Sequence, residues 1–343
     1  MEPKISILTP VWNGLPYIKE CINSVLKQDF QDWQLILSDN GSTDGTLEYL
    51  DSLTDKRIRV IKQVDNIGIM ANVNFLFQQS SAALSYILCA DDYFIGTKAL
   101  STVIKFWQQA PAEVGFVTYN PPLPTVYPIQ NLEFQVLPEI IKGGQADIWF
   151  LIFGNFCGNL SCMSVRTELV NKTSGFDLDF PSAGDFEFWS RLARLTAMAV
   201  QRDDIVYIRR HEKVASNYMN QKGEGFKQHV QIYEKIINAL AADGKLNRKE
   251  LISYFNYEIC SYHYRVALKA ASKGHFTYLK KLLKAKSAIL WPLQRQPYLF
   301  SFSLINKRQR LTYPMAQQLL KINQHKPIKY ESSNTSRGLW LEN

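Results

Sequence analysis

Two adjacent carboxylates, Asp91 and Asp92, follow an apolar stretch at residues 86–89 that we expect to be a buried strand. Two negative charges side by side at the end of such a strand repel each other unless a cation neutralises them. Mg²⁺ and Mn²⁺ prefer hard oxygen ligands, and their sites often combine one or two carboxylates with phosphate oxygens of a substrate. The pair therefore predicts a divalent metal that stabilises the charge on a departing diphosphate. An acidic turn without a metal is the alternative.

A third carboxylate, Asp39, follows the predicted strand at 33–38 and precedes Asn40 and Gly41. It could accept a hydrogen bond from the imide N–H of a pyrimidine or from a ribose hydroxyl. It could also belong to a plain turn in which Ser42 or Thr43 caps the next helix. The chain has neither the G-x-G-x-x-G nor the G-x-x-x-x-G-K-[ST] pattern, so nucleotide binding would use another kind of site.

Asp185 and His211 complete the set of candidate residues. Asp185 stands at the start of an apolar helical pattern, where it could cap the helix or act as general base toward an acceptor hydroxyl. His211 follows Arg209 and Arg210. The arginines could pair with phosphate and the imidazole could ligate the metal, the alternative being an ordinary surface histidine.

Most of these residues follow predicted strands, and in an open α/β sheet ligands bind outside the carboxyl ends of the strands. Over the first 120 residues short β-rich stretches alternate with helical patterns, which predicts a mostly parallel sheet with helices on both faces. Ile18, Cys21, Ile22 and Val25 form one apolar helical stripe after the first strand. We expect strands at 5–8, 33–38, 58–63, 86–89, 115–119 and 205–209, and helices at 45–53, 69–80, 98–109 and 185–196.

Charge divides the chain unevenly. Residues 1–205 carry 15 Lys and Arg against 23 Asp and Glu, whereas residues 206–343 carry 24 against 8. An acidic part suits metal and polyhydroxyl chemistry, and a basic part suits phosphate, anionic lipid or nucleic acid. The basic part shows helical patterns at 226–242, 248–272 and 275–291. The four prolines within 121–128 predict a loop, and the polar end from 326 predicts a frayed tail.

Composition excludes several classes of protein. With 46% hydrophobic residues the chain is not mainly disordered. Its longest apolar stretch, near 148–163, is broken by glycine and asparagine, and the N-terminus lacks the features of a secretory signal, so we expect a cytoplasmic chain. The five cysteines are scattered, which indicates reduced structural thiols.

In their order along the chain these motifs resemble those of the family 2 glycosyltransferases, inverting nucleotide-sugar enzymes with the GT-A fold. The resemblance covers about residues 4–215. The segment ISILTPVWNGLPYIKECINSVLKQDFQDWQLILSDNGSTDGT is similar to the opening βαβ unit of that family. Asn66-Ile67-Gly68 with Asn74 resembles its N-x-G-x-x-x-x-x-N pattern, Asp91-Asp92 its D-x-D position, and Gly184-Asp185 its E-D position.

The resemblance implies a role for each matching residue. For the nucleotide donor, Thr9, Pro10 and Trp12 would line the base pocket, Asp39 would bind the base, and Asn66 and Asn74 would belong to the donor site. For the metal, Asp91 would lie by the ribose and the ion, Asp92 would ligate it, and His211 would touch the ion or the diphosphate. Asp185 would be the catalytic base. Three positions depart from the family pattern. Asn40 replaces a second Asp, Cys89 stands where many members have the first Asp of D-x-D, and Gly184 replaces Glu.

The resemblance further implies a metal-dependent enzyme using Mn²⁺ or Mg²⁺. It would move one sugar from a nucleotide-diphosphate sugar, preferably a UDP- or dTDP-sugar, to a hydroxyl of a glycan or lipid-linked glycan in surface polysaccharide or lipid-linked oligosaccharide synthesis. The Q-x-x-R-W string of processive synthases is absent, which favours a single addition.

Two alternatives remain. A nucleotidyltransferase would normally open with a glycine-rich, basic phosphate loop, which this sequence lacks. A non-catalytic module would bind a nucleotide sugar or another anionic ligand. Nucleic acid is disfavoured because the basic part has no RNP, KH or zinc-finger signature.

We expect a GT-A domain at 1–215, a helical basic extension at 216–325 and a flexible tail at 326–343. The predicted helix at 275–291 places Phe276, Leu279, Leu283 and Leu290 near one face, with Lys280, Lys281, Lys284 and Lys286 around it. Such a helix could dock on anionic lipid at the inner face of the plasma membrane, or pack on the catalytic domain with its lysines in water.

Overall fold

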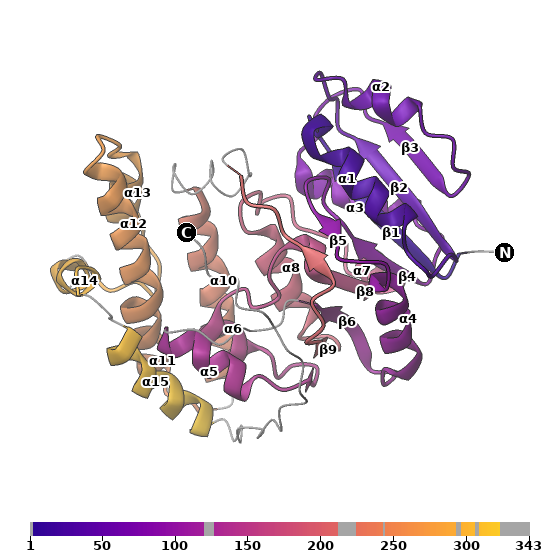
Figure 1. The fold of residues 1–343 in the computed structure, drawn as a ribbon. Helices are drawn as coiled ribbons and strands as arrows, with labels where there is room; N and C mark the ends of the chain where they lie inside the picture. Colours follow the sequence, from indigo (N-terminus) through magenta and orange to yellow (C-terminus); the bar gives the residue numbers. More distant parts are fainter. Residues whose placement is uncertain are drawn as a thin grey trace.

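The computed structural model describes residues 3–119, 127–211, 224–242, 244–292, 296–305 and 309–322. Figure 1 shows that the strands gather in the N-terminal part, beside helices from the C-terminal part. The domain boundary expected at 215, most of the proline-rich segment 121–128 and the tail at 326–343 lie outside the described residues. Pro128 is described, and it begins a helix instead of ending the expected loop, because proline suits the first turn, where its missing N–H is not needed.

An eight-stranded sheet forms the centre of the N-terminal part, in the order β3-β2-β1-β4-β8-β6-β9-β7. The first four strands in this order are parallel, β8 is antiparallel to both neighbours, β9 is parallel to β6, and β7 is antiparallel to β9. The expected mostly parallel α/β sheet is therefore confirmed. Its strands are β1 (Ile5–Val11), β2 (Trp33–Asp39), β3 (Ile58–Lys62), β4 (Leu84–Ile87), β6 (Val114–Thr118), β7 (Ile140–Ile141), β8 (Met163–Arg166) and β9 (Ala197–Val200).

The strand expected at 205–209 is shorter and belongs to a separate two-stranded sheet. In that sheet β10 (Val206–Tyr207) pairs antiparallel with β5 (Tyr93–Phe94), and Val206 lies opposite Phe94. This pairing places the chain after β10 beside the chain after β4. Residues about 120 positions apart in the sequence thereby meet at the candidate site.

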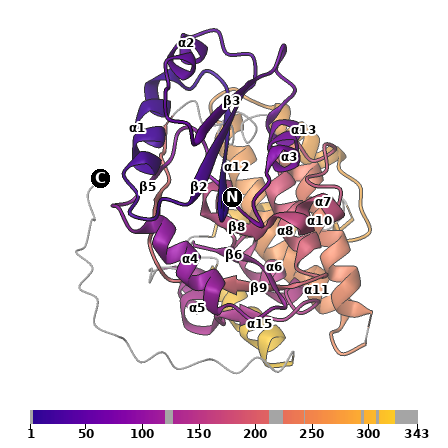
Figure 2. The same cartoon turned by 90° about the vertical axis from the view of Figure 1, so that its right-hand side faces the viewer.

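Helices cover both faces of the sheet, as expected. Figure 2 shows α1 (Leu15–Leu26) and α2 (Thr46–Asp51) on one side of β2 and α3 (Ile69–Gln79) on the other. All four residues of the predicted stripe on α1 are buried, which confirms its orientation. The other helices around the sheet are α4 (Ala99–Gln109), α5 (Pro128–Val136), α6 (Asp147–Phe153), the 3-10 turn η1 (Leu160–Cys162), α7 (Thr167–Lys172) and α8 (Gly184–Leu192).

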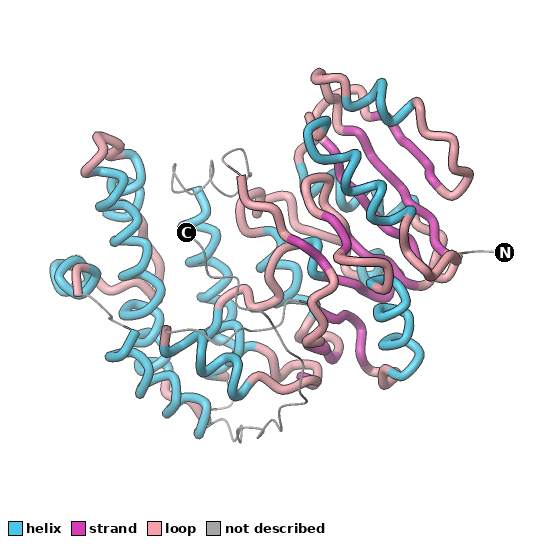
Figure 3. The backbone as a smooth tube through the Cα atoms, viewed as in Figure 1, coloured by secondary structure: helices cyan, strands magenta, loops and turns pink. Residues whose placement is uncertain are grey.

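The C-terminal part is helical, as Figure 3 shows. It contains α10 (Glu224–Ala241), α11 (Arg248–Tyr254), the π-helix η2 (Phe255–Cys260), α12 (Ser261–Ala271), α13 (Thr277–Lys284), α14 (Gln296–Ser303) and α15 (Gln309–Ile322). Helix α10 packs on α6, and the Tyr254 hydroxyl donates to the Ile152 carbonyl at 3.3 Å. The helices therefore share one hydrophobic core with the sheet. Among the described residues no helix is both long and apolar enough to cross a membrane.

The helix expected at 275–291 is wrong in its second half. Helix α13 ends at Lys284, and Ala285 is extended. Further along, the Asn256 side chain donates to the Ile289 carbonyl at 2.7 Å and accepts from the Trp291 N–H at 3.1 Å. These main-chain groups therefore bond to a side chain of the π-helix and do not continue α13. Leu290 consequently does not share a helical face with Phe276.

Candidate active site

The predicted site residues lie at one edge of the sheet. Asp39 is the last residue of β2, and Asp91 and Asp92 follow β4, with β1 between these two parallel strands. The carboxyl ends of parallel strands meet at the same edge, where ligands of open α/β sheets bind. The strand order alone thus brings the three carboxylates to one region.

Asp39 is almost fully buried, with 1% of its surface exposed. Its Oδ2 accepts the Ser42 N–H at 3.1 Å, whereas its Oδ1 is buried and has no hydrogen-bond partner among the described residues. The hydroxyl of Thr9, on β1, is also buried without a partner there. Buried polar atoms are nearly always bonded in folded proteins, so these two atoms are open to a bound ligand or to ordered water. Pro10, which follows Thr9 in the sequence, is buried, whereas the Trp12 side chain is 57% exposed.

The loops after β1 and β2 hold each other in place. The Asn13 N–H donates to the Ser42 hydroxyl at 2.8 Å, and the Asn13 side-chain carbonyl accepts the Thr43 N–H at 2.8 Å. Asn13 has a φ of 50°, a left-handed conformation that asparagine tolerates better than most residues. The two loops therefore form one rigid wall next to Asp39.

Asn40, which replaces the acidic residue of the family pattern, has a clear structural use. Its amide nitrogen donates to the Asn66 Oδ1 at 2.9 Å, and its Oδ1 accepts the Ile67 N–H at 2.9 Å. A carboxylate could accept the second bond but could not donate the first. Asn66 in turn accepts the Gly68 N–H at 2.9 Å, so the Asn40–Asn66 pair shapes the turn before α3.

Asn74 is bonded at both ends of its amide. It donates to the Phe176 carbonyl at 2.8 Å and accepts the Phe176 N–H at 2.7 Å. The side chain thus ties α3 to the segment that leads to α8. Its donor-binding role stays a prediction, and the observed contacts are those of a structural brace.

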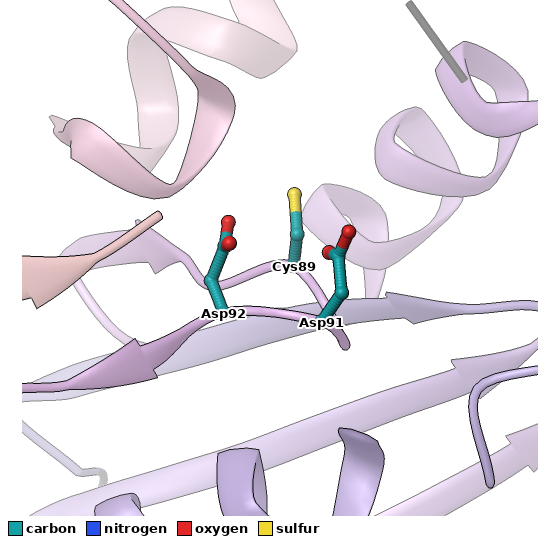
Figure 4. A group of neighbouring side chains, drawn as sticks. All are labelled: Cys89, Asp91 and Asp92. Atoms are coloured by element: carbon teal, nitrogen blue, oxygen red, sulfur yellow. The ribbon is translucent and has the colours of Figure 1, made fainter. Parts of the chain in front are cut away.

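Asp91, Asp92 and Cys89 point to the same side of the loop after β4 (Figure 4). One ligand atom from each lies within 4.8 Å of the others. Burial and the nearby aspartates raise the pKa of the Cys89 thiol well above its usual range, so the thiol is protonated in the metal-free protein. Asp91 is half-buried, and its Oδ2 lies 3.1 Å from the His211 Nε2. A carboxylate oxygen and an imidazole nitrogen are donors that fit Mn²⁺, and oxygen donors fit Mg²⁺.

Asp92 is buried, and both of its oxygens already accept hydrogen bonds. The Ser161 hydroxyl donates to Oδ2 at 2.6 Å and the Arg209 N–H donates to Oδ1 at 2.9 Å. Burial and the charge of Asp91 raise the pKa of Asp92 to about 6, although the two hydrogen bonds act to lower it. The structure therefore gives Asp92 a positioning contact with β10 and η1, and its predicted role as a metal ligand stays untested.

His211 is held by more than Asp91. Its ring stacks on Tyr17 with centroids 4.7 Å apart, and the Arg209 guanidinium lies over the same Tyr17 ring at 4.9 Å. Arg209 also donates from Nε to the Asp91 carbonyl at 3.0 Å and pairs with Glu20. One of the two arginines expected to pair with phosphate, Arg209, is thus engaged in fixing the loop after β10 to that after β4.

Asp185 is the second residue of α8. Its Oδ1 accepts the Phe186 N–H at 2.8 Å and its Oδ2 accepts the Asn155 amide at 2.9 Å. Burial raises the pKa of the Asp185 carboxyl, and these two donors oppose that rise. Gly184 lies against Met70, whose side-chain atoms would be 3.0 Å from a Cβ at this position. The glycine that replaces the family's glutamate therefore fits a tightly packed site.

One segment, residues 155–161, connects the predicted base with the predicted metal site. Asn155 at its start bonds Asp185 and the Gly158 carbonyl, and Ser161 at its end bonds Asp92 and the Cys89 N–H. Neither Asn155 nor Ser161 was among the predicted site residues. The alternation of glycine and asparagine in 154–159 was the available signal, because such residues favour tight turns.

Comparison with known proteins agrees with this geometry. Residues 6–172 match the family model Glycosyl transferase family 2. An uncharacterized glycosyltransferase of Haemophilus influenzae is 24% identical over 241 residues, which is 66% of this chain and 72% of that protein. A Bacillus subtilis protein named for teichuronic acid biosynthesis, the glycosyltransferase TuaG, is 29% identical over 121 residues, which is 35% of this chain and 48% of TuaG.

Solved structures show the same fold. TarS residues 1–349 of S. aureus, in complex with UDP-GlcNAc, align with 93% of this chain and 88% of their own at 18% identity and a TM-score of 0.53. The mannosyltransferase PcManGT of Pyrobaculum calidifontis, in complex with GDP-Man and Mn²⁺, aligns with 94% of this chain and 86% of its own at 15% identity and a TM-score of 0.55. The sheet order, the carboxylates at its edge and the family match agree: residues 6–172 of this chain are similar to glycosyl transferase family 2, and the chain has the GT-A fold.

Proposed function

We propose that the protein is an inverting glycosyltransferase that moves one sugar from a nucleotide-diphosphate sugar to a hydroxyl group of a glycan. The observation that carries this proposal is the 155–161 segment, which bonds Asp185 at one end and Asp92 at the other. A direct displacement needs a base on the acceptor side and charge stabilisation on the leaving-group side, held in a fixed relation. The segment provides such a relation.

The donor half of the site lies at Asp39 and Thr9. The unbonded Asp39 Oδ1 is a buried acceptor for an imide N–H, and the Thr9 hydroxyl can donate or accept beside it. Uracil and thymine both carry such an imide N–H, so this acceptor fits our proposed UDP- or dTDP-sugar, and guanine offers an equivalent N1–H. The neighbour with UDP-GlcNAc is consistent with this preference, although the one with GDP-Man shows that the fold also hosts guanine.

Asp91 and His211 are the residues that we propose to hold a divalent ion, with Asp92 behind them as a positioning residue. Mn²⁺ or Mg²⁺ bound there would supply positive charge to the diphosphate leaving group. The protein's own part is to keep the Asp91 carboxylate and the His211 ring in register, through Tyr17 and Arg209.

Asp185 is the proposed general base. A carboxylate with a raised pKa accepts a proton more readily than an ordinary aspartate, while the Phe186 N–H and the Asn155 amide keep it ionised enough to act. It would take the proton of the acceptor hydroxyl as that oxygen attacks the sugar from the face opposite the leaving diphosphate. The anomeric configuration would therefore invert.

The proposed acceptor is a hydroxyl of a surface polysaccharide or of a lipid-linked glycan. The relative named for teichuronic acid biosynthesis supports a polysaccharide, and the absence of the Q-x-x-R-W string from the sequence favours a single addition.

The test is a comparison of binding and turnover in Asp185→Asn. This variant keeps the size of the side chain, so we expect it to bind nucleotide diphosphate with Mn²⁺ as the parent does and to lose transfer by about 10²–10⁴-fold. Thermal unfolding with UDP, dTDP, GDP, CMP or ADP, each with Mn²⁺, Mg²⁺ or EDTA, identifies the donor class first. Unchanged turnover in the variant would remove Asp185 from the mechanism. Absence of any response to nucleotides and sugars would favour a non-catalytic binding module.

A further inference from the structure

The outer side of α14 is an apolar surface that the rest of the described chain leaves uncovered. The inner side of this helix is packed, since Leu299 and Ser303 are buried and the Phe302 ring lies 5.0 Å from that of Tyr257 in the π-helix. Figure 1 shows α14 at the margin of the molecule, on the side of α12 away from the sheet. Its opposite side therefore faces solvent.

That opposite side carries Tyr298, Phe300, Leu304 and Ile305, which we call the apolar ridge. These side chains are 69%, 43%, 65% and 42% exposed. The last two continue the helical turn, because the Leu304 and Ile305 N–H groups donate to the carbonyls of residues 301 and 302. At about 100° per residue the four positions fall within one arc of about 160° on the side away from Leu299, and this arc also contains the exposed Ser301. Large apolar side chains gathered on one exposed face mark an interaction surface.

The surroundings of the ridge are uniformly basic. Residues 259–330 contain 14 Lys and Arg and no Asp or Glu. Helix α12 packs against both α13 and α14, so these helices and their basic side chains form one cluster with the ridge. The basic residues exposed in this part of the described chain are Arg265, Lys269, Lys273, Lys280, Lys284, Lys286, Arg310 and Lys321.

We propose that the apolar ridge and these basic residues form a docking surface for an anionic lipid bilayer. Aromatic and aliphatic side chains enter the headgroup region while lysines and arginines stay with the lipid phosphates, which is how amphipathic surfaces bind membranes. A second copy of the chain is a poorer partner, because a symmetric contact would press two basic surfaces together. Nucleic acid would match the charge but would leave Leu304 and Ile305 without a use.

The structure also redefines the surface expected at 275–291. On α13, Tyr278 and Leu282 are buried, whereas Phe276 and Leu283 are 54% and 46% exposed. This end of the chain therefore adds charge and two apolar side chains to the surface, while the larger apolar contact with lipid is assigned to α14. This inference concerns a surface apart from the candidate active site and holds whether or not Asp185 is the base.

The experiment is co-sedimentation of the full chain with vesicles of phosphatidylcholine alone or of equal parts phosphatidylcholine and phosphatidylglycerol. We expect binding to the anionic vesicles at 50 mM salt and its loss with the neutral ones. Replacement of Lys273, Lys280, Lys284 and Lys286 by Gln should weaken the affinity for anionic vesicles about fivefold per lysine, which corresponds to about 1 kcal/mol each. The four replacements together should weaken it at least about 100-fold. A matched control replaces Lys27, Lys56, Lys105 and Lys142, all exposed in the sheet-containing part, and leaves binding within a few-fold.

The ridge is tested by Tyr298→Ser with Leu304→Ser, compared with Leu195→Ser, which removes an exposed apolar side chain elsewhere. We expect the double variant to weaken vesicle binding about tenfold or more, at low and at high salt alike, and Leu195→Ser to leave it unchanged. Three results would overturn the proposal: no sedimentation with anionic vesicles, equal loss in the control lysine variant, or a dimer in sedimentation velocity that Tyr298→Ser dissociates. Vesicle binding displaced by RNA but unaffected by the ridge variant would point instead to a nucleic-acid surface.

Discussion

Asn155→Ala tests the link between the 155–161 segment and the base. Asn155 provides the side-chain donor to Asp185, at 2.9 Å, and the remaining donor is the Phe186 N–H. A hydrogen bond to a charged group contributes about 1.5–3 kcal/mol. That energy favours the ionised carboxylate, so losing the bond makes protonation easier and raises the pKa of Asp185.

The size of the effect follows from the linkage between energy and protonation. About 1.4 kcal/mol corresponds to one pH unit, so the acidic limb of the kcat/KM profile moves up by about 1–2 pH units. In the region where the parent is still active and the variant is protonated, turnover falls by about 10–100-fold. Above the new limb the base is ionised again and the variant approaches the parent rate.

The assay is release of nucleoside diphosphate measured from pH 5 to 9 for the parent, Asn155→Ala and Asn159→Ala. Asn159 lies in the same segment and bonds the Ser161 N–H, with no bond to Asp185. We expect its variant to lower activity at all pH values without moving the limb. The reasoning is refuted if Asn155→Ala leaves the limb in place and changes only KM, because Asn155 would then act on binding and not on the base.

Three further predictions concern other parts of the chain. Asp39→Ala should weaken binding of UDP or dTDP by about tenfold or more, because it removes a buried hydrogen-bond acceptor. Isothermal titration calorimetry measures this affinity, and an unchanged value would exclude Asp39 from the base pocket. His229 is half-buried next to His263, and desolvation lowers its pKa to about 4, below its unfolded value of 6.5, so the unfolded chain binds more protons between these values and stability falls as pH drops through that window. At pH 5 the contribution of His229 to this loss is about 2 kcal/mol, and urea unfolding at pH 7.5 and 5.0 should show it as the difference between the pH-dependent changes of the parent and of His229→Gln; equal changes in both would contradict it. Gly115→Ala should lower the free energy of unfolding by about 1–3 kcal/mol, because a Cβ there would lie 2.5 Å from Leu169 and Thr196 side-chain atoms; an unchanged unfolding midpoint would show that these neighbours yield freely.

Local pattern was sufficient for the elements of the opening βαβ units. The strands at β1, β2 and β3 and the helices α1, α3 and α4 lie within a few residues of their expected positions, because each has a regular apolar periodicity bounded by turn residues. The short strands β5, β7, β8 and β9 were not predicted. Each spans two to four residues, and their formation depends on distant partners such as β10 and β6.

The helical extension shows the same limit. Periodicity located α10 and α11, but the expected helix at 275–291 is divided because Asn256, in the π-helix, takes the main-chain groups of Ile289 and Trp291. A single polar side chain more than 30 positions away thus outweighs local helical preference. The exposed apolar ridge on α14 likewise depends on which side of that helix α12 covers.

The sequence by itself determined which residues could do chemistry, since carboxylates and glycine-containing turns at the ends of apolar stretches reflect local geometry and side-chain chemistry. Tertiary structure decided how they are used. It paired Asp91 with His211, turned both oxygens of Asp92 toward Ser161 and Arg209, and committed Asn74 to the main chain of Phe176. These assignments depend on which hydrogen-bond partners burial leaves available, and burial is a property of the packed chain as a whole.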